Sequence, residues 1–281
     1  MGEPQLSIPI VHVDVFTGDL FGGNPAAICL LENWLPDSLM QSIAAENNLS
    51  ETAFLVKHQE GHWDLRWFTP ITEVDLCGHA TLAAGAALFW QQATAEEKIE
   101  FRTRSGALFV SKKGKLYALD LPAIPALEPY PLIVGLGAEP LECWRASNSN
   151  VMALFDDENA VRNLNPDFQL LAELGKVGVI ATASGKDCDF VSRFFAPGCG
   201  VNEDPATGSS HCTLTPYWRR RLNKTSLYAR QLSARGGELF CEDRGDRVTI
   251  SGGAVLYMQG FLSLTGLLAH TIQTQEKNFL K

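Results

Sequence analysis

Residues 66–90 read RWFTPITEVDLCGHATLAAGAALFW, and residues 193–218 read RFFAPGCGVNEDPATGSSHCTLTPYW. Both stretches open with arginine, an aromatic residue and phenylalanine, with proline two residues later. A three-residue insertion then aligns Gly78 of the first stretch with Gly208 of the second. Residues 104–109, RSGALF, are repeated in the second copy as residues 235–240, RGGELF. A single repeat at so long a period predicts two similar domains and not a solenoid.

Length and composition are those of a soluble globular protein. The chain has 281 residues, of which 46% are hydrophobic and 20% are charged, so it can bury a sizeable core. Its formal charge of -9 argues against a nucleic-acid partner, which needs a basic surface. An anionic small molecule stays possible, because backbone N–H groups at a helix start can bind it locally. No apolar run is long enough to span a membrane.

The cysteines favour a reducing compartment. There are seven, an odd number without regular spacing, and no CxxC pair is present. This usage indicates reduced thiols and no structural zinc site. The first residues pass directly into strand-like alternation and lack the pattern of a signal peptide. We therefore expect a cytoplasmic protein without a metal.

The first half is expected to be rich in strands. Residues 8–16 alternate apolar and polar side chains, as a strand with one wet face does. A turn at residues 22–25 follows, without the lysine and spacing of a phosphate-binding loop. The further elements expected here are strands at 26–31, 53–56 and 63–68, a helix over 37–47 and a hairpin formed by 107–111 and 116–121.

The segment 79–92 is predicted to be a helix that is apolar on every side. Alanine recurs through it, and these small side chains make the helix slim. A helix without a polar face must be surrounded by other structure. We expect it to pass through the middle of a curled sheet.

Four prolines in residues 122–131 mark the expected boundary between a half at 1–125 and a half at 126–281. The last residues can return to the first half. The second half should repeat the design, with a helix from Gly208 that Pro216 should kink or end. Its other expected elements are a helix at 167–174, strands at 177–181 and 189–195, and hairpins over 227–262. The predicted class is α+β, with two pseudo-symmetric domains, each a curled, barrel-like mixed β-sheet around a central helix.

The two repeated helix starts, at Gly78 and Gly208, suggest a binding site. Domains related by a pseudo-two-fold axis bring equivalent points into one cleft. Each helix start offers unpaired N–H groups and about half a positive charge. Glycine lets a ligand approach the backbone closely. Two converging starts would hold a carboxylate, or the enolate-like charge that forms when a proton leaves the adjacent carbon. The alternative is that His79 and Ser209 only cap their own helices.

An acid–base catalyst is then needed, and Glu51 is the first candidate. It lies at a helix-to-strand junction within an apolar run, where burial would raise its pKa. The alternative is a solvated loop carboxylate. Asp204 is a candidate orienting group, His79 a proton donor and Ser209 a hydrogen-bond donor.

Cys77 precedes the first helix start and could act as a base if the helix end favoured its thiolate. Its counterpart in the second copy is Thr207. A symmetric mechanism with two thiols is therefore not available to this chain.

Five motifs, in this order, resemble the phenazine biosynthesis PhzF-like family, and the resemblance covers essentially the whole chain. That family has the diaminopimelate-epimerase-like fold, so the resemblance implies this fold, a homodimer and no cofactor. The motifs are Gly23-Asn24-Pro25-Ala26-Ala27, Asn48-Leu49-Ser50-Glu51-Thr52, Phe68-Thr69-Pro70, Cys77-Gly78-His79-Ala80-Thr81 and Asp204-Pro205-Ala206-Thr207-Gly208-Ser209.

The resemblance also implies roles. In the phenazine enzyme a glutamate shifts a proton on a dihydro-hydroxyanthranilate, and Glu51 matches it. Related epimerases use two opposed cysteines, of which only Cys77 is kept here. The resemblance thus implies a cofactor-independent isomerase acting on a small anionic metabolite in the interdomain cleft. The alternatives are an amino-acid racemase or epimerase that uses Cys77, or a member that only binds a metabolite or a protein. The implied catalytic residues are Glu51, His79, Asp204 and Ser209, and the implied substrate-binding residues are Asn24, Cys77, Gly78, Thr207 and Gly208.

Overall fold

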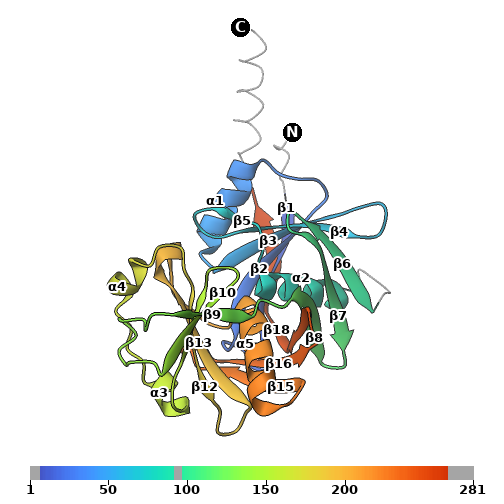
Figure 1. The fold of residues 1–281 in the computed structure, drawn as a ribbon. Helices are drawn as coiled ribbons and strands as arrows, with labels where there is room; N and C mark the ends of the chain where they lie inside the picture. The colour runs from blue at the N-terminus through green and yellow to red at the C-terminus, as the bar shows by residue number, and fades with distance from the viewer. Residues whose placement is uncertain (1–6, 92–96, 265–281) are drawn as a thin grey trace, which may run out of the picture.

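The computed structural model describes residues 7–91 and 97–264 and has two halves built on one plan (Figure 1). In each half a curled mixed sheet surrounds a helix, α2 (Gly78–Trp90) in the first and α5 (Gly208–Leu222) in the second. The predicted α+β class with two curled sheets is confirmed.

The first-half strands are β1 (Ser7–Val15), β2 (Asn24–Leu31), β3 (Glu51–Lys57), β4 (Trp63–Phe68), β5 (Glu73–Val74), β6 (Lys98–Thr103), β7 (Gly106–Lys113) and β8 (Leu116–Pro122). The remaining strands are β9 (Ala126–Tyr130), β10 (Glu142–Ala146), β11 (Val151–Leu154), β12 (Val179–Ser184), β13 (Phe190–Ala196), β14 (Val201–Asp204), β15 (Ser226–Gln231), β16 (Gly237–Asp243), β17 (Arg247–Gly252) and β18 (Ala254–Ser263).

The strand pairing repeats between the halves. In the first half β2 pairs with β3 and β4 with β6 in parallel, and the other pairs are antiparallel. In the second half β11 with β12 and β13 with β15 are the parallel pairs. The halves join where β8 and β17, which hold equivalent places, pair antiparallel. A pseudo-two-fold axis therefore passes between these two strands.

The halves also exchange their last strands. β9 follows β8 in the chain but pairs with β10 of the second half. β18 follows β17 but pairs with β1, so the chain returns to the first half. Each sheet is thus completed by a strand that follows the other half in sequence.

Helix α2 is enclosed, as its composition predicts. All its residues from Gly78 to Leu88 are buried, and it packs against β1, β2, β3, β7 and β8. The structure ends the helix at Trp90, and the predicted end at residue 92 lies outside the described residues. The sheet comes so close that a Cβ atom on Gly85 would lie 2.5 Å from Cγ1 of Val110.

The prediction that Pro216 could end its helix is wrong, because α5 continues to Leu222. Proline has no N–H, so the carbonyl of Cys212, four residues earlier, loses its usual helical donor. The backbone N–H of Ile124 donates to that carbonyl instead, at 3.0 Å. Ile124 lies in the crossover from β8 to β9, so the connection between the halves supplies the missing bond.

The predicted helix over 37–47 is confirmed as α1 (Asp37–Asn47), which ends where Asn48 adopts a left-handed conformation. The predicted helix at 167–174 is shorter, α4 (Phe168–Ala172), and the side chain of Asp167 caps it. The sequence analysis missed α3 (Glu158–Arg162), a five-residue helix. None of the helices in residues 7–91 and 97–264 is long and apolar enough to cross a membrane.

The close approach of α2 to β7 predicts the effect of a methyl group at position 85. Gly85→Ala should lower the free energy of unfolding, because overpacking costs about 1–3 kcal/mol and better helix propensity returns only about 1 kcal/mol. The change should cost less in a Val110→Ala background, which removes the nearest side-chain atoms. Urea unfolding of the native protein, Gly85→Ala, Val110→Ala and the double variant measures these free energies. An equal loss of stability from Gly85→Ala in both backgrounds would show that packing against Val110 is not the cause.

Candidate active site

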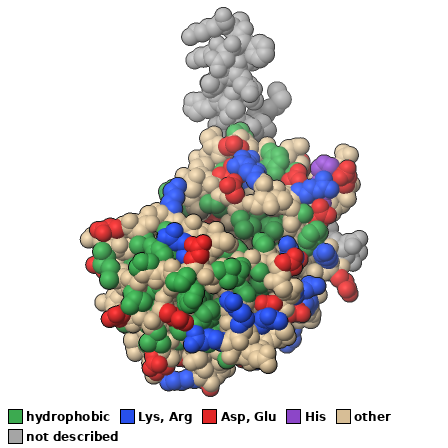
Figure 2. Space-filling model, viewed as in Figure 1, with side chains coloured by type: hydrophobic (Ala, Val, Ile, Leu, Met, Phe, Trp, Pro, Cys, Tyr) green, Lys and Arg blue, Asp and Glu red, His purple; other side chains and the backbone are tan. Residues whose placement is uncertain are grey.

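The two repeated helix starts meet in the middle of the protein. A Cβ atom on Gly78 would lie 3.9 Å from the Cα of Gly208, so the backbones of α2 and α5 nearly touch there. A cavity of about 240 Å³ lies beside this contact. On the face shown in Figure 2, hydrophobic side chains gather near the centre and charged ones lie around them. The residues that line the cavity are Ser50, Glu51, Leu76, Cys77, Gly78, His79, Asn150, Lys176, Gly178, Phe194, Ala196, Cys199, Val201, Asp204, Thr207, Gly208 and Ser209.

A larger cavity, about 750 Å³, lies at the end of β1 and β2 beside Trp34, Lys57 and Trp63. It contains none of the predicted site residues. The smaller cavity is the candidate site because the ionisable groups with perturbed surroundings converge there.

Glu51 and His79 form the central pair of this cavity. Glu51 is the first residue of β3, His79 is the second residue of α2, and Oε2 of Glu51 lies 3.1 Å from Nε2 of His79. Both are mostly enclosed, with side-chain exposures of 17% and 7%. The direction of the contact does not meet hydrogen-bond geometry, and Oε2 accepts from no other donor in the described residues. The carboxylate of Glu51 lines the cavity, and its Oε2 lies against the ring of His79.

The thiol of Cys77 lies beside the same imidazole. Its Sγ is 3.5 Å from Nδ1 of His79. Burial, together with the negative charge of Glu51, raises the pKa of Cys77 to about 11. Burial therefore works against the thiolate on which a role of Cys77 as a base would depend.

Burial alone would lower the pKa of His79, but its neighbours Cys77 and Glu51 raise that pKa well above the ordinary value. Because burial favours the neutral thiol of Cys77, the negative charge of Glu51 is the neighbouring effect that favours the protonated ring of His79.

Asp204 lies across the cavity and is anchored by both halves. It is the last residue of β14, and its Oδ1 accepts a hydrogen bond from Nδ2 of Asn24 at 2.8 Å. The hydroxyl of Thr207 donates to Oδ2. Burial, with a further contribution from Glu51, raises the pKa of Asp204 against the opposing effects of His79 and of these two hydrogen bonds.

Asn24 does not line the cavity. It is completely buried at the start of β2 and also donates to the backbone carbonyl of Ala206, at 2.9 Å. Arg235 of the second half holds the preceding turn through hydrogen bonds to the carbonyls of Gly22 and Gly23. Asn24 thus joins the first half to the segment that carries Asp204.

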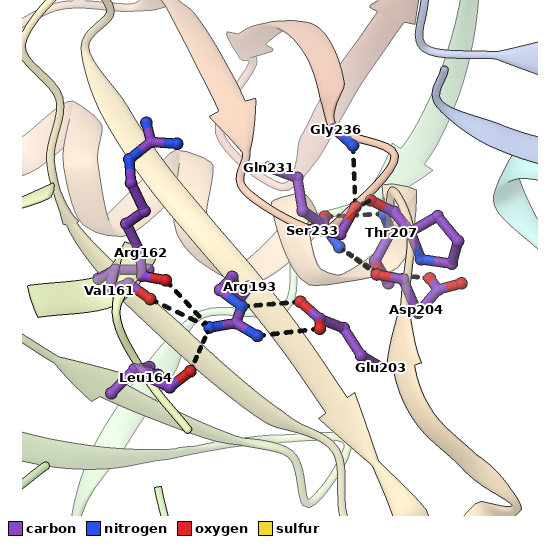
Figure 3. Close-up of polar contacts among 11 residues, drawn as sticks. Val161, Arg162, Leu164, Arg193, Glu203, Asp204, Thr207, Gln231, Ser233 and Gly236 are labelled. Atoms are coloured by element: carbon purple, nitrogen blue, oxygen red, sulfur yellow. Dashed lines mark hydrogen bonds and ion pairs between the residues drawn. The ribbon is translucent and has the colours of Figure 1, made fainter. Parts of the chain in front are cut away.

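Gln231, at the end of β15, completes this network, and the sequence analysis missed it (Figure 3). Its Oε1 accepts from the N–H of Thr207 at 2.8 Å. Its Nε2 donates to the carbonyl of Asp204 at 2.7 Å and to Oγ1 of Thr207 at 3.1 Å. Both ends of one buried amide therefore fix the start of α5.

A repeated ion pair supports the strand before each helix start. Nε of Arg193 lies 2.7 Å from Oε1 of Glu203, and the same guanidinium donates to three backbone carbonyls near the end of α3 (Figure 3). In the first half, Nε of Arg66 lies 2.7 Å from Oε1 of Glu73. The sequence repeat aligns Arg66 with Arg193 and, after the three-residue insertion, Glu73 with Glu203.

The chemistry of the two halves is not symmetric. Strand pairing sets Thr52 opposite Phe68 and Val179 opposite Phe195, so Glu51 of the first half corresponds to Gly178 of the second. In the same way Cys77 corresponds to Thr207, and His79 to Ser209. The thiol, the imidazole and the more exposed carboxylate all come from the first half.

Most of the site residues expected from the sequence come together: Glu51, Cys77, Gly78, His79, Asp204, Thr207, Gly208 and Ser209 all line the cavity. Asn24 lies behind it. Lys176, Asn150 and Phe194 also line it and were missed, since only the folded second half brings them near Glu51.

Comparison with known proteins agrees with this arrangement. The family profile described as "Phenazine biosynthesis-like protein" (PhzC-PhzF) matches residues 13–260. An uncharacterized isomerase of Pseudomonas aeruginosa is 51% identical over 262 residues, which cover 90% of this chain and 98% of that protein. A PhzF-family protein of Enterococcus faecalis has a crystal structure with a TM-score of 0.88 and 47% identity, over 92% of this chain and 100% of that one. A hydroxyproline epimerase of Agrobacterium vitis, with 13% identity and a TM-score of 0.61 over 93% of this chain and 92% of that one, has the same fold. The chain belongs to the phenazine biosynthesis-like PhzC-PhzF family.

Proposed function

We propose that the protein is an isomerase that moves a proton on a small carboxylate-containing metabolite without a cofactor. Glu51 takes the proton from a carbon next to the substrate's unsaturated system. The same residue returns it to a second carbon of that system, so one C–H bond breaks, another forms and the double bond shifts. The enzyme ends unchanged, and no oxidant or reductant is consumed.

The observation that carries the proposal is the carboxylate of Glu51, which lines the cavity and lies mostly enclosed beside the ring of His79. A carboxylate held in a cavity next to an imidazole can accept a proton from a ligand. His79, 3.1 Å away, can stabilise the negative charge that develops or supply a proton.

The surroundings favour an anionic substrate. The helix starts at Gly78 and Gly208 present backbone N–H groups to the cavity, and the side chain of Lys176 lies at its edge. Partial positive charges fixed in this way stabilise an enolate-like intermediate better than water does. They also give a carboxylate group a place to bind.

The racemase alternative finds less support. Inversion at one carbon by two bases needs an acid–base group on each side of that carbon. Gly178 and Ser209 occupy the places of Glu51 and His79 in the second half, and the thiol of Cys77 has a raised pKa. Asp204, the carboxylate across the cavity, already accepts hydrogen bonds from Asn24 and Thr207, so one base serving one face of the substrate fits this arrangement better.

Glu51→Gln should abolish proton exchange and leave binding nearly intact. A panel of small carboxylates, including dihydroaromatic acids and amino acids, would be incubated with protein in D2O and followed by proton NMR. The native protein should introduce deuterium into at least one compound, and the variant should be slower by roughly 10²–10⁴.

Glu46→Gln is the matched control, because Glu46 is exposed on α1 and does not line the cavity. It should exchange at the native rate. If Glu51→Gln exchanges as fast as this control, Glu51 is not the base. If no compound exchanges but several bind both proteins equally, the binding-protein alternative replaces the isomerase.

The ring of His79 should titrate well above pH 6.5, the ordinary pKa of histidine, and Glu51→Gln should move its midpoint down. The sign follows from charge: a neighbouring carboxylate favours the imidazolium, and its removal leaves desolvation, which favours the neutral ring. Two-dimensional NMR of the imidazole signals, assigned with His79→Asn, measures both midpoints. A midpoint that is unchanged by Glu51→Gln would contradict the pairing.

Cys77→Ala separates the isomerase from the racemase. A single-base isomerase should keep its exchange rate within about one order of magnitude, whereas loss of a catalytic base costs roughly 10²–10⁴. The rates come from the same deuterium assay. Loss of exchange on that larger scale, with an unchanged circular dichroism spectrum, would favour the racemase.

A further inference from the structure

Three side chains of the cavity form a set that metal ions bind. Glu51 offers a carboxylate oxygen, Cys77 a sulfur and His79 an imidazole nitrogen, and the three ligand atoms lie within 4.8 Å of one another. Catalytic zinc sites commonly use three protein ligands of these kinds and keep the fourth position open. The sequence analysis found no CxxC pair and did not identify this set, because its members come from the start of a strand and the start of a helix.

We propose that Glu51, Cys77 and His79 bind a thiophilic divalent cation such as Zn²⁺, and that this binding stops proton transfer. The binding stands on the ligand geometry alone. The inhibition rests on the proposed function.

The distances suit tetrahedral coordination. Two ligands that each lie 2.0–2.3 Å from a tetrahedral zinc ion are about 3.5 Å apart. Sγ of Cys77 lies 3.5 Å from Nδ1 and 4.0 Å from Nε2 of His79, and Oε2 of Glu51 lies 3.1 Å from Nε2. The side chains must rotate to bring the sulfur and the carboxylate oxygen to the same ring nitrogen.

The kind of metal follows from the ligands. Thiolate and imidazole select zinc, cadmium or cobalt, whereas magnesium and calcium prefer oxygen ligands. All three ligands come from the first half.

The charges around the cluster oppose each other. Glu51 and Asp204 favour a cation, while Lys176 and the two helix starts disfavour it. The sulfur binds a metal as a thiolate, so metal binding releases the proton of the Cys77 thiol.

Inhibition follows because the metal uses the groups that move the proton. Once Oε2 of Glu51 is bound to the cation, its lone pair can no longer accept a proton from the substrate. A metal-bound protein should therefore not catalyse exchange.

Cobalt titration of the reduced protein tests the site without any substrate. A thiolate bound to Co²⁺ gives an intense near-ultraviolet charge-transfer band, and Zn²⁺ should bleach it by displacement. The native protein should show this band, and Cys77→Ser should lose it.

Cys199→Ser is the matched control, because Cys199 also lines the cavity but is not a member of the cluster. It should keep the band. A second cluster, His58, Glu60 and His62 at the β3–β4 turn, contains no sulfur and cannot produce it. No band in the native protein, or a band that survives Cys77→Ser, would overturn the site.

The inhibition is measured separately, with the compound that the native protein deuterates. Zn²⁺ should stop exchange by the native protein and by Cys199→Ser, and excess chelator should restore it. Cys77→Ala should be at least tenfold less sensitive. Full sensitivity in Cys77→Ala would overturn the inhibition, whereas failure of the whole panel to exchange would overturn the proposed function and leave the cobalt result standing.

Discussion

The direct contact between two helix starts is the constraint on which the rest of the structure depends. Each start carries unpaired N–H groups and about half a positive charge, so two of them repel each other when they meet away from water. The two starts lie side by side, since a Cβ atom added to Gly78 would be in van der Waals contact, at 3.9 Å, with the Cα of Gly208. The carboxylates of Glu51 and Asp204 lie beside this positive region and offset it. The pairing of β8 with β17 fixes the two helices in this position. A cavity that attracts negative charge is therefore a consequence of the fold.

The two halves share a scaffold and differ in chemistry. The ion pairs Arg66–Glu73 and Arg193–Glu203 are alike in both, as is the order of the strands. Within the cavity, however, the first half keeps a carboxylate, a thiol and an imidazole, and the second half has Gly178, Thr207 and Ser209 in their places. A collision explains part of the difference, since a Cβ atom on Gly178 would lie 2.4 Å from the ring of Phe194. The second half instead contributes Asp204 and the rigid network around Gln231. The first half thus brings the thiol of Cys77 and the imidazole of His79 to the cavity, and the second half brings a buried hydrogen-bond network.

Sequence patterns predict the features that depend on local chemistry or on the repeat. The apolar helix α2, the capped helix α1 and the convergence of the helix starts all follow from such patterns. Features set by distant chain segments could not be predicted. The helix containing Pro216 continues because Ile124, some 90 residues away in sequence, bonds to the carbonyl that proline leaves free. Gln231 gains its role only when β15 lies next to the start of α5. The raised pKa of Cys77 reflects complete burial, which sequence alone did not reveal.

The claim that one base works from one side of the substrate is the centre of this account. The most direct test is stereochemical. For the compound that exchanges with D2O, the configuration at both deuterated carbons would be determined by proton NMR coupling constants. A single carboxylate at Glu51 predicts that deuterium enters both positions from the same face. Entry from opposite faces would require a second base across the cavity and would contradict the account.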